Sequence, residues 1–146
     1  MLKLTVNQSL EYGETEIIIN CSVMDNRLKK LIEHIRQYSF SLLGFAEGEK
    51  YSIPLENILY IESVDGRTFL YCQDKVYEYK ETLTSLDQRL LHTSFVRISK
   101  SCIMNLNALK CVKSFLNHRM EATLTTGEKL MVSRNYIEQL KKKLEE

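Results

Sequence analysis

The sequence contains no apolar run of about 18 residues, the length that a membrane-spanning helix needs. Its first residues, MLKLTVNQSLEYGE, turn polar at once and hold no apolar signal-peptide core. We therefore expect no membrane insertion, no secretory signal and a cytoplasmic location. The chain has 146 residues, which is enough for one domain with a small appendage.

The cysteines lack any metal-binding or disulfide pattern. None of the four forms a CxxC pair, and the three histidines stand at no zinc-motif spacing from them. Because the cysteines lie in apolar runs, we expect reduced, mostly buried thiols, no metal site and no cofactor. The residues concerned are Cys21, Cys72, Cys102, Cys111, His34, His92 and His118.

Motifs of enzymes are also missing. The chain has no GxSxG, HExxH, Walker A or GxGxxG sequence, and no Asp follows a βα repeat as a phospho-acceptor would. Glu62 and Asp65 are close together, but they flank a predicted turn. We do not expect an enzyme.

Carboxylates are absent from the 33 residues between Gln88 and Met120, in a chain with 19 acidic residues. This stretch has a net charge of +6, whereas residues 1–87 have a net charge of −5. Such asymmetry predicts a surface that faces a polyanion, with an inert basic face as the alternative. The six basic residues are Arg89, Arg97, Lys100, Lys110, Lys113 and Arg119.

Residues 1–40 predict a small β-β-α unit. KLTV and TEIIINCSV are typical of strands, and a helical period follows from Met24 to about Tyr38. Ser22 and Asp25 have the spacing of a capping box. Two strands and one helix bury little apolar surface by themselves. We therefore expect this unit to dock on the rest of the chain or to support a homodimer.

Residues 41–146 predict a second, mainly β domain. Short strand-like runs alternate with turn signals, of which Asp65-Gly66 and Thr126-Gly127 are the clearest. A leucine-striped helix is predicted over residues 82–92, capped by Thr82 or Thr84, and a last helix from Arg134 to Leu144, capped by Ser133. The predicted strands are FSLLGF, KYSI, ILYIESV, TFLYCQ, KVYEY, FVRI, CIMNL, ALKCV, EATLTT and KLMVS.

Two polar segments inside this domain carry groups that recognise DNA. In FVRISKSCIMN, apolar residues frame a loop that offers Ser99, Lys100 and Ser101 to phosphates and base edges. In VSRNY, Arg134 and Asn135 open a helix, where an arginine can bind guanine, an asparagine can bind adenine, and the helix terminus suits a phosphate. The alternative for VSRNY is a capping serine followed by ordinary residues of a first turn.

The chain resembles the LytTR family of DNA-binding domains in ILYIES, SLDQRL, FVRISKSCIMN and TGEKLMVSRNY, from about Tyr51 to Leu144. The resemblance implies an elongated stack of antiparallel sheets with two short helices, preceded here by the β-β-α unit. It implies binding of double-stranded DNA through loops in successive major grooves, at half-sites that occur in pairs. The implied or inferred DNA-binding residues are Arg67, Thr68, Arg97, Ser99, Lys100, Ser101, Arg134 and Asn135.

This sequence departs from the family at two of those positions. The family commonly has His where this chain has Ser99, and an aromatic residue where it has Cys102. Residues 1–40 match neither the domain nor the receiver usually attached to it. We predict a bacterial transcription regulator that binds specific duplex sequences as a homodimer; the alternative is a protein- or ligand-binding β module without nucleic acid.

Overall fold

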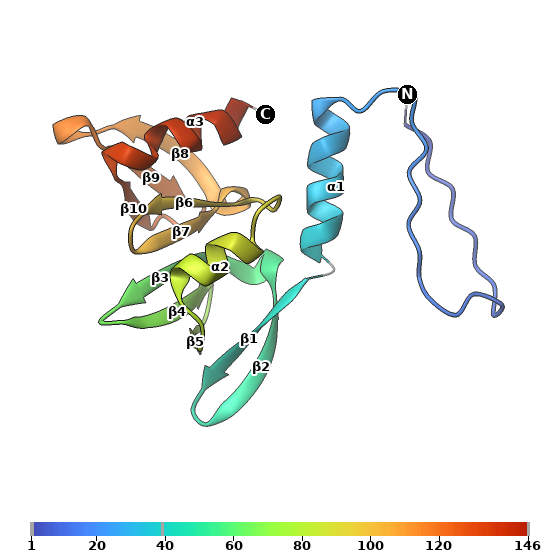
Figure 1. Ribbon diagram of the computed structural model, residues 1–146, viewed down its shortest axis with the longest axis horizontal. Helices are drawn as coiled ribbons and strands as arrows, with labels where there is room; N and C mark the ends of the chain where they lie inside the picture. Colours follow the sequence, from blue (N-terminus) through green and yellow to red (C-terminus); the bar gives the residue numbers. More distant parts are fainter. Residues whose placement is uncertain (1, 39, 146) are drawn as a thin grey trace.

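The computed structural model describes residues 2–38 and 40–145 (Figure 1). Within them, the strands form a seven-stranded antiparallel sheet in the order β2-β1-β5-β4-β3-β7-β6 and a three-stranded antiparallel sheet in the order β10-β9-β8. The prediction of a mainly β domain of stacked sheets is confirmed. The strands are β1 (Ser41–Ala46), β2 (Glu49–Pro54), β3 (Ile58–Val64), β4 (Arg67–Cys72), β5 (Val76–Tyr79), β6 (Phe95–Ser99), β7 (Cys102–Asn105), β8 (Leu109–Ser114), β9 (Met120–Leu124) and β10 (Lys129–Val132); the helices are α1 (Asn26–Tyr38), α2 (Leu83–Arg89) and α3 (Ile137–Glu145).

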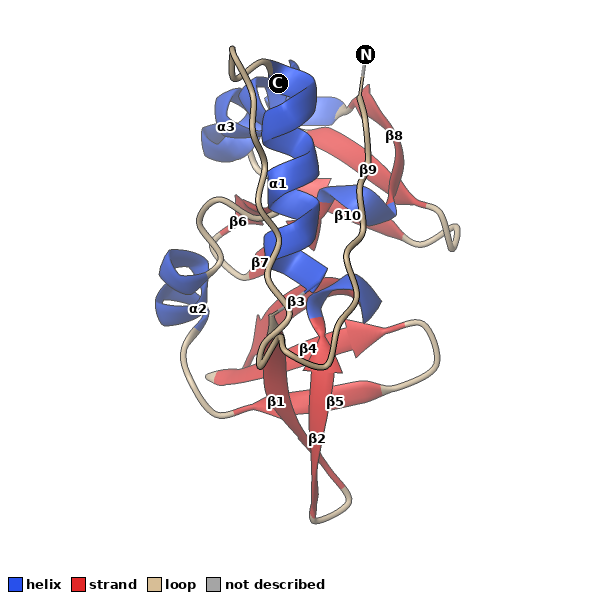
Figure 2. Cartoon of the chain, turned by 90° about the vertical axis from the view of Figure 1, so that its right-hand side faces the viewer, coloured by secondary structure: helices blue, strands red, loops and turns tan. Residues whose placement is uncertain are grey.

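The middle of the large sheet separates two cores. Successive strand residues point to opposite faces, so Ile61 and Ile103 pack with Leu86 of α2, whereas Met104 packs with the small sheet and Leu140 of α3. All five side chains are fully buried. Helix α2 therefore covers one face of the large sheet, while the small sheet and α3 lie on the other side, with α3 against β6 (Figures 1 and 2).

Local turn chemistry connects the strands as the sequence predicts. Asp65 and Gly66 have φ angles of 51° and 77°, and Val64 pairs with Arg67, which makes a two-residue hairpin. Gly127 has a φ of 92° in the turn between β9 and β10. Thr82 caps α2, because its side chain accepts a hydrogen bond from the backbone N–H of Ser85 at 3.1 Å.

Two predictions for the N-terminal residues are wrong. Residues 2–25, here called the N-terminal arm, form no strand, since neither strand-like segment of the arm pairs with a strand of the two sheets. The capping residue of α1 is Asp25 and not Ser22, because its Oδ1 accepts from the N–H of Leu28 at 2.8 Å. Extended segments need a partner to satisfy their backbone groups, and this single chain supplies none.

The last helix also begins differently. Residues Arg134–Tyr136 form a 3₁₀ turn, and α3 starts at Ile137. Ser133 occupies the capping position, but its side chain makes no capping hydrogen bond. Within the described residues, none of the helices is long and apolar enough to cross a bilayer.

All four cysteines are free thiols, but the expectation that most are buried is wrong. Cys21 and Cys111 are exposed, Cys72 is half-buried and Cys102 is buried. Burial, with the nearby charges of Glu62 and Glu128, raises the pKa of the Cys102 thiol to about 12. A thiol with such a pKa is almost entirely protonated at neutral pH and reacts slowly.

This difference predicts two fast thiols in the native protein. With a chromogenic disulfide reagent at about pH 8, Cys21 and Cys111 should react first and Cys102 only after unfolding, because thiolate and access are both required. Replacement of Cys111 with serine should remove one equivalent from the fast phase. Rapid reaction of Cys102 in the native protein would contradict the buried placement.

Candidate nucleic-acid interface

Three segments with predicted DNA-binding residues meet at one edge of the molecule. The backbone N–H of Ser63, at the end of β3, donates to the carbonyl of Ser101 at 2.8 Å, and that of Ser133 donates to the carbonyl of Ile98 at 2.8 Å. These bonds connect the β3–β4 turn, the β6–β7 loop and the segment Ser133–Asn135 in a row, here called the loop edge (left side of Figure 1).

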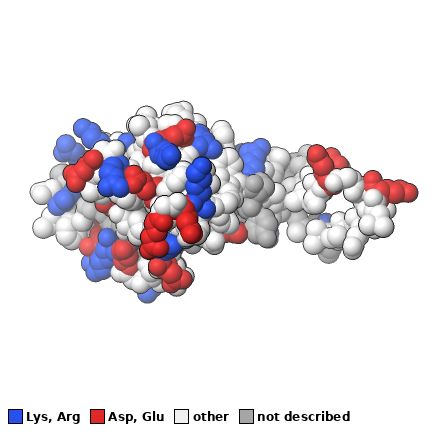
Figure 3. Space-filling model, turned by 90° about the horizontal axis from the view of Figure 1, so that it is seen from below, with Lys and Arg blue, Asp and Glu red and all other residues white. Residues whose placement is uncertain are grey.

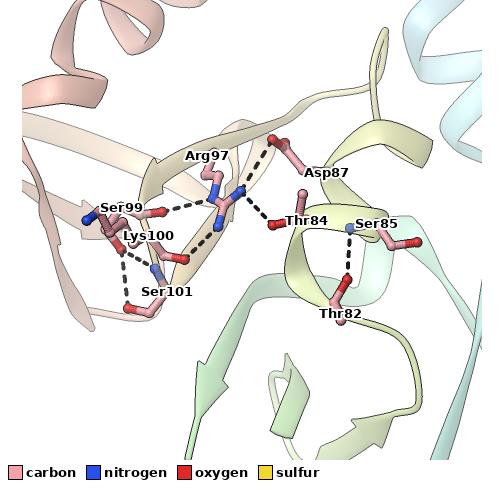
Figure 4. A network of polar contacts seen from close by, with 8 residues as sticks. All are labelled: Thr82, Thr84, Ser85, Asp87, Arg97, Ser99, Lys100 and Ser101. Carbon is pink, nitrogen blue, oxygen red and sulfur yellow. Dashed lines mark hydrogen bonds and ion pairs between the residues drawn. The ribbon is translucent and has the colours of Figure 1, made fainter. Parts of the chain in front are cut away.

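The β6–β7 loop is held by its own side chains and by Arg97 (Figure 4). Ser99 Oγ accepts from the N–H of Ser101 at 3.2 Å, which closes the turn around Lys100. Arg97 Nε donates to the carbonyl of Ser99 at 3.1 Å, and Nη2 donates to the carbonyl of Lys100 at 2.6 Å. These three hydrogen bonds fix the loop before any ligand arrives, which lowers the entropy cost of binding.

Arg97 itself is turned away from solvent. Its side chain is only 16% exposed, and Nη1 lies 3.9 Å from the Asp87 carboxylate and 3.4 Å from Thr84 Oγ1, both on α2. All of its nitrogen atoms thus face the protein (Figure 4). In the structure these bonds hold the loop, and the contact of Arg97 with DNA stays a prediction.

Lys100 and Arg134 are the cations that the loop edge presents freely. Both are exposed, and neither side chain forms an ion pair with any residue in the described part of the chain. Asn135 is exposed beside Arg134, and the 3₁₀ turn is closed by the N–H of Tyr136, which donates to the carbonyl of Ser133 at 2.9 Å. An unpaired cation on a fixed loop keeps its donors available for an anion or a base edge.

The two predicted residues of the β3–β4 turn differ in exposure. Thr68 is only 4% exposed, so its hydroxyl has almost no surface for a ligand. Arg67 is exposed, but both arms of its guanidinium bond to the carboxylate of Glu78 on β5, and it lies 5.3 Å from the Phe69 ring. The hydrogen bond from Arg67 lowers the pKa of Glu78, so this pair is ionised at neutral pH and competes with any phosphate for Arg67.

The structure adds a loop that the sequence reasoning did not assign to the site. Met120 pairs with both Ser114 and Val132, so the β8–β9 loop lies next to Ser133 at the loop edge. Asn117 and His118 both have a φ of 59°, and the Arg119 guanidinium lies 5.7 Å from the Phe115 ring. The signal in the sequence was the polar Asn117-His118 pair between two strands, because asparagine and histidine tolerate positive φ.

The basic stretch does not form one continuous basic face. Three of its six cations pair with carboxylates from elsewhere in the chain: Arg89 with Glu81 at 3.2 Å, Arg97 with Asp87 at 3.9 Å, and Lys113 with Glu121 at 3.5 Å. Figure 3 shows acidic and basic groups intermixed over the face that it displays. The charge run in the sequence overstated the local positive charge, because carboxylates just outside the run pair with half of its cations.

No metal chemistry is evident at this edge. Within the described residues, no three His, Cys, Asp or Glu side chains are grouped so that they could hold a metal ion. What the loop edge offers is hydroxyls, amides, two unpaired cations and an aromatic-backed arginine, all on short loops. Such groups recognise phosphates and the edges of bases.

The sequence is similar to known DNA-binding domains and regulators. The family model described as the LytTr DNA-binding domain matches residues 48–145. The chain is 32% identical over 99 residues to the sensory transduction protein LytT of Enterococcus faecalis, which is 67% of this chain and 40% of that protein. It is 33% identical over 86 residues to the transcriptional regulatory protein LytR of Staphylococcus aureus, which is 59% of this chain and 35% of that protein.

The fold agrees with these matches. A solved LytTr DNA-binding domain, of a putative methyl-accepting/DNA response regulator from Bacillus cereus, superposes with a TM-score of 0.67 over 71% of this chain and 95% of that chain, at 22% identity. The match to the curated relatives spans about two-fifths of their length or less. Because the family model matches well over half of the residues of this chain, the chain belongs to the LytTR family of DNA-binding domains.

Proposed function

We propose that this protein binds specific sequences of double-stranded DNA as a bacterial cytoplasmic transcription regulator, with the loop edge as its reading surface. The observation that carries the proposal is the alignment of the β6–β7 loop and the Ser133–Asn135 segment on one edge, each with an exposed, unpaired cation. Family membership makes DNA the ligand.

Each segment has a distinct part in this proposal. Lys100 and Arg134 read base edges from neighbouring major grooves, and Arg134 has the fork that matches guanine O6 and N7. Ser99, Ser101 and Asn135 supply short-range hydrogen bonds, while Arg97 holds the β6–β7 loop. Arg67 leaves the carboxylate of Glu78 and binds a phosphate of the DNA backbone, which anchors the β3–β4 turn.

The proposal predicts a steep dependence of DNA affinity on salt. Each phosphate neutralised contributes a slope of about −0.9 to a plot of log affinity against log salt concentration, so three or four contacting cations should give about −3. Fluorescence anisotropy with a labelled duplex measures this slope. Arg119→Ala should reduce its magnitude by about 1, whereas Lys50→Ala, which changes an exposed cation of the edge strand β2, should not change it.

A flat salt response with intact binding would rule out the loop edge as a phosphate-contacting surface. No binding to any duplex would favour instead a β module that recognises protein or a small ligand. Selection of bound duplexes from a random pool with the purified protein tests sequence specificity directly. Enrichment of one motif, in pairs at a fixed spacing, is the result expected for a dimeric reader.

A further inference from the structure

The N-terminal arm exposes more apolar surface than a soluble monomer normally does. Ten large apolar side chains between residues 2 and 24 are exposed, and the arm stands apart from α1, on the side of that helix away from the two sheets (Figure 1). Isolated exposed apolar residues are common, but a continuous series of this size marks an interaction surface. Their exposed fractions are Leu2 75%, Leu4 83%, Val6 80%, Leu10 105%, Tyr12 62%, Ile17 62%, Ile18 69%, Ile19 37%, Val23 73% and Met24 47%.

The backbone of the arm is equally unpartnered by the rest of the chain. The turn between its two limbs is held by the N–H of Tyr12, which donates to the carbonyl of Ser9 at 3.3 Å. Neither limb pairs with a strand of the two sheets. Strand-type sequence with unpaired backbone groups binds readily to another chain.

The apolar stripe of helix α1 is also only partly covered. It meets the body of the protein mainly at the 3₁₀ turn Leu55–Asn57. Leu31 remains 39% exposed, and Leu28, Ile32 and Ile35 of the same stripe are only half-buried. An amphipathic helix normally covers its apolar stripe, so α1 too lacks part of its partner.

Charge indicates what that partner is. The arm holds Lys3 against four carboxylates, and those are Glu11, Glu14, Glu16 and Asp25. α1 holds four arginines and lysines against Glu33, so the two segments carry net charges of −3 and +3. Figure 3 shows the arm, at the right, as white and red with almost no blue. The arm therefore suits a surface like that of α1, and the α1 of its own chain leaves it uncovered.

We propose that two copies of this chain form a symmetric dimer in which the arm of each copy lies on α1 of the other. Each pair of segments is then used twice, as in any two-fold interface. The ten exposed side chains of one arm amount to on the order of 1,000 Å², which is above the roughly 800 Å² per partner of a stable interface. The interface lies on the opposite side of the body from the loop edge, so both loop edges stay open (Figure 1).

The proposal concerns the free protein, so it is tested without DNA and can fail independently of the proposed function. Light scattering of the full chain at micromolar concentration should give twice 17.1 kDa. The double variant Leu4→Ser/Ile18→Ser should be monomeric, whereas Leu43→Ser/Val76→Ser, which removes two exposed apolar side chains from the large sheet, should remain dimeric. Circular dichroism of each variant confirms that it is folded.

Charge reversal identifies the two surfaces. Glu14→Lys/Glu16→Lys and Lys29→Glu/Lys30→Glu should each raise the dimer dissociation constant about tenfold or more, because like charges then face one another. An equimolar mixture of the two variants should dimerise more tightly than either alone, since every arm and helix pair is again of opposite charge. The proposal would be overturned if the full chain stayed monomeric or if the arm variants dimerised as tightly as the wild type. It would also be overturned if mixing the two charge-reversed variants did not restore dimerisation.

Discussion

Replacement of Asn105 with alanine should lower the free energy of unfolding by about 2–3 kcal/mol, because it removes three hydrogen bonds and leaves the buried carbonyl of Ile58 without the Asn105 donor. Asn105, at the end of β7, is only 2% exposed. Its Nδ2 donates to the carbonyl of Ile58 at 2.8 Å, and its Oδ1 accepts from Ser94 Oγ at 2.7 Å and from the N–H of Asn107 at 3.0 Å. One side chain thus joins the start of β3 to the end of β7.

Urea unfolding monitored by circular dichroism measures this effect, with Asn57→Ala as the control. Asn57 is exposed in the 3₁₀ turn before β3, so its replacement should change stability by less than about 0.5 kcal/mol. Asn105→Asp keeps the size of the side chain but buries a charge that cannot donate to Ile58, and should be at least as damaging as alanine. A loss below about 1 kcal/mol for Asn105→Ala would mean that water or a local shift replaces these bonds.

The sequence predicted those parts of the fold that depend on neighbours in sequence. Alternating apolar residues gave each strand of the two sheets, and Asp65-Gly66 gave the hairpin because both residues accept positive φ. The cap of α2 by Thr82 followed in the same way. These features form whichever way the sheets stack.

Predictions were incomplete where a partner outside the segment itself decides the outcome. The segments KLTV and TEIIINCSV have strand propensity, but the single chain offers no edge for them. The basic stretch predicted a surface that faces a polyanion, and its net charge did not show that Glu81, Asp87 and Glu121, which lie just outside it, pair with three of its six cations. Local pattern contains no information on such pairs.

The candidate site shows the same division. Spacing placed Lys100 and Arg134 on polar segments, and the structure presents both at one edge. The sequence could not distinguish Arg97, which braces the loop from behind, from a residue that faces a ligand. Nor could it show that Thr68 is buried, because the alternation of β4 has to be combined with the position of α2 and the neighbouring strands.

Removal of either unpaired cation should weaken recognition of the preferred operator more than it weakens non-specific binding. Lys100→Ala and Arg134→Ala should each cost roughly 1–3 kcal/mol on the operator, or about 5- to 150-fold in affinity, because a base-reading side chain is lost. On random duplex DNA the loss should be much smaller, so the ratio of specific to non-specific affinity falls.

Lys113→Ala is the matched control. Lys113 is an exposed cation of β8 that already pairs with Glu121, and strand geometry gives it at most a phosphate contact. Its replacement should weaken binding to operator and random DNA by about the same factor and leave their ratio unchanged. Affinities of all three variants should be measured at one salt concentration, since the non-specific component depends on it.

A bracing role for Arg134 makes a different prediction. If Arg134 supported the last helix through Glu138, its removal would cost about 0.3–0.5 kcal/mol of stability and would leave the specificity ratio intact. The structure gives no ion pair between these residues, and Arg134 precedes α3 in a 3₁₀ turn. We therefore expect Arg134→Ala to have the melting temperature of the wild type and to lose discrimination between operator and random DNA. If either alanine variant keeps the wild-type ratio of operator affinity to random-DNA affinity, the replaced residue does not read a base.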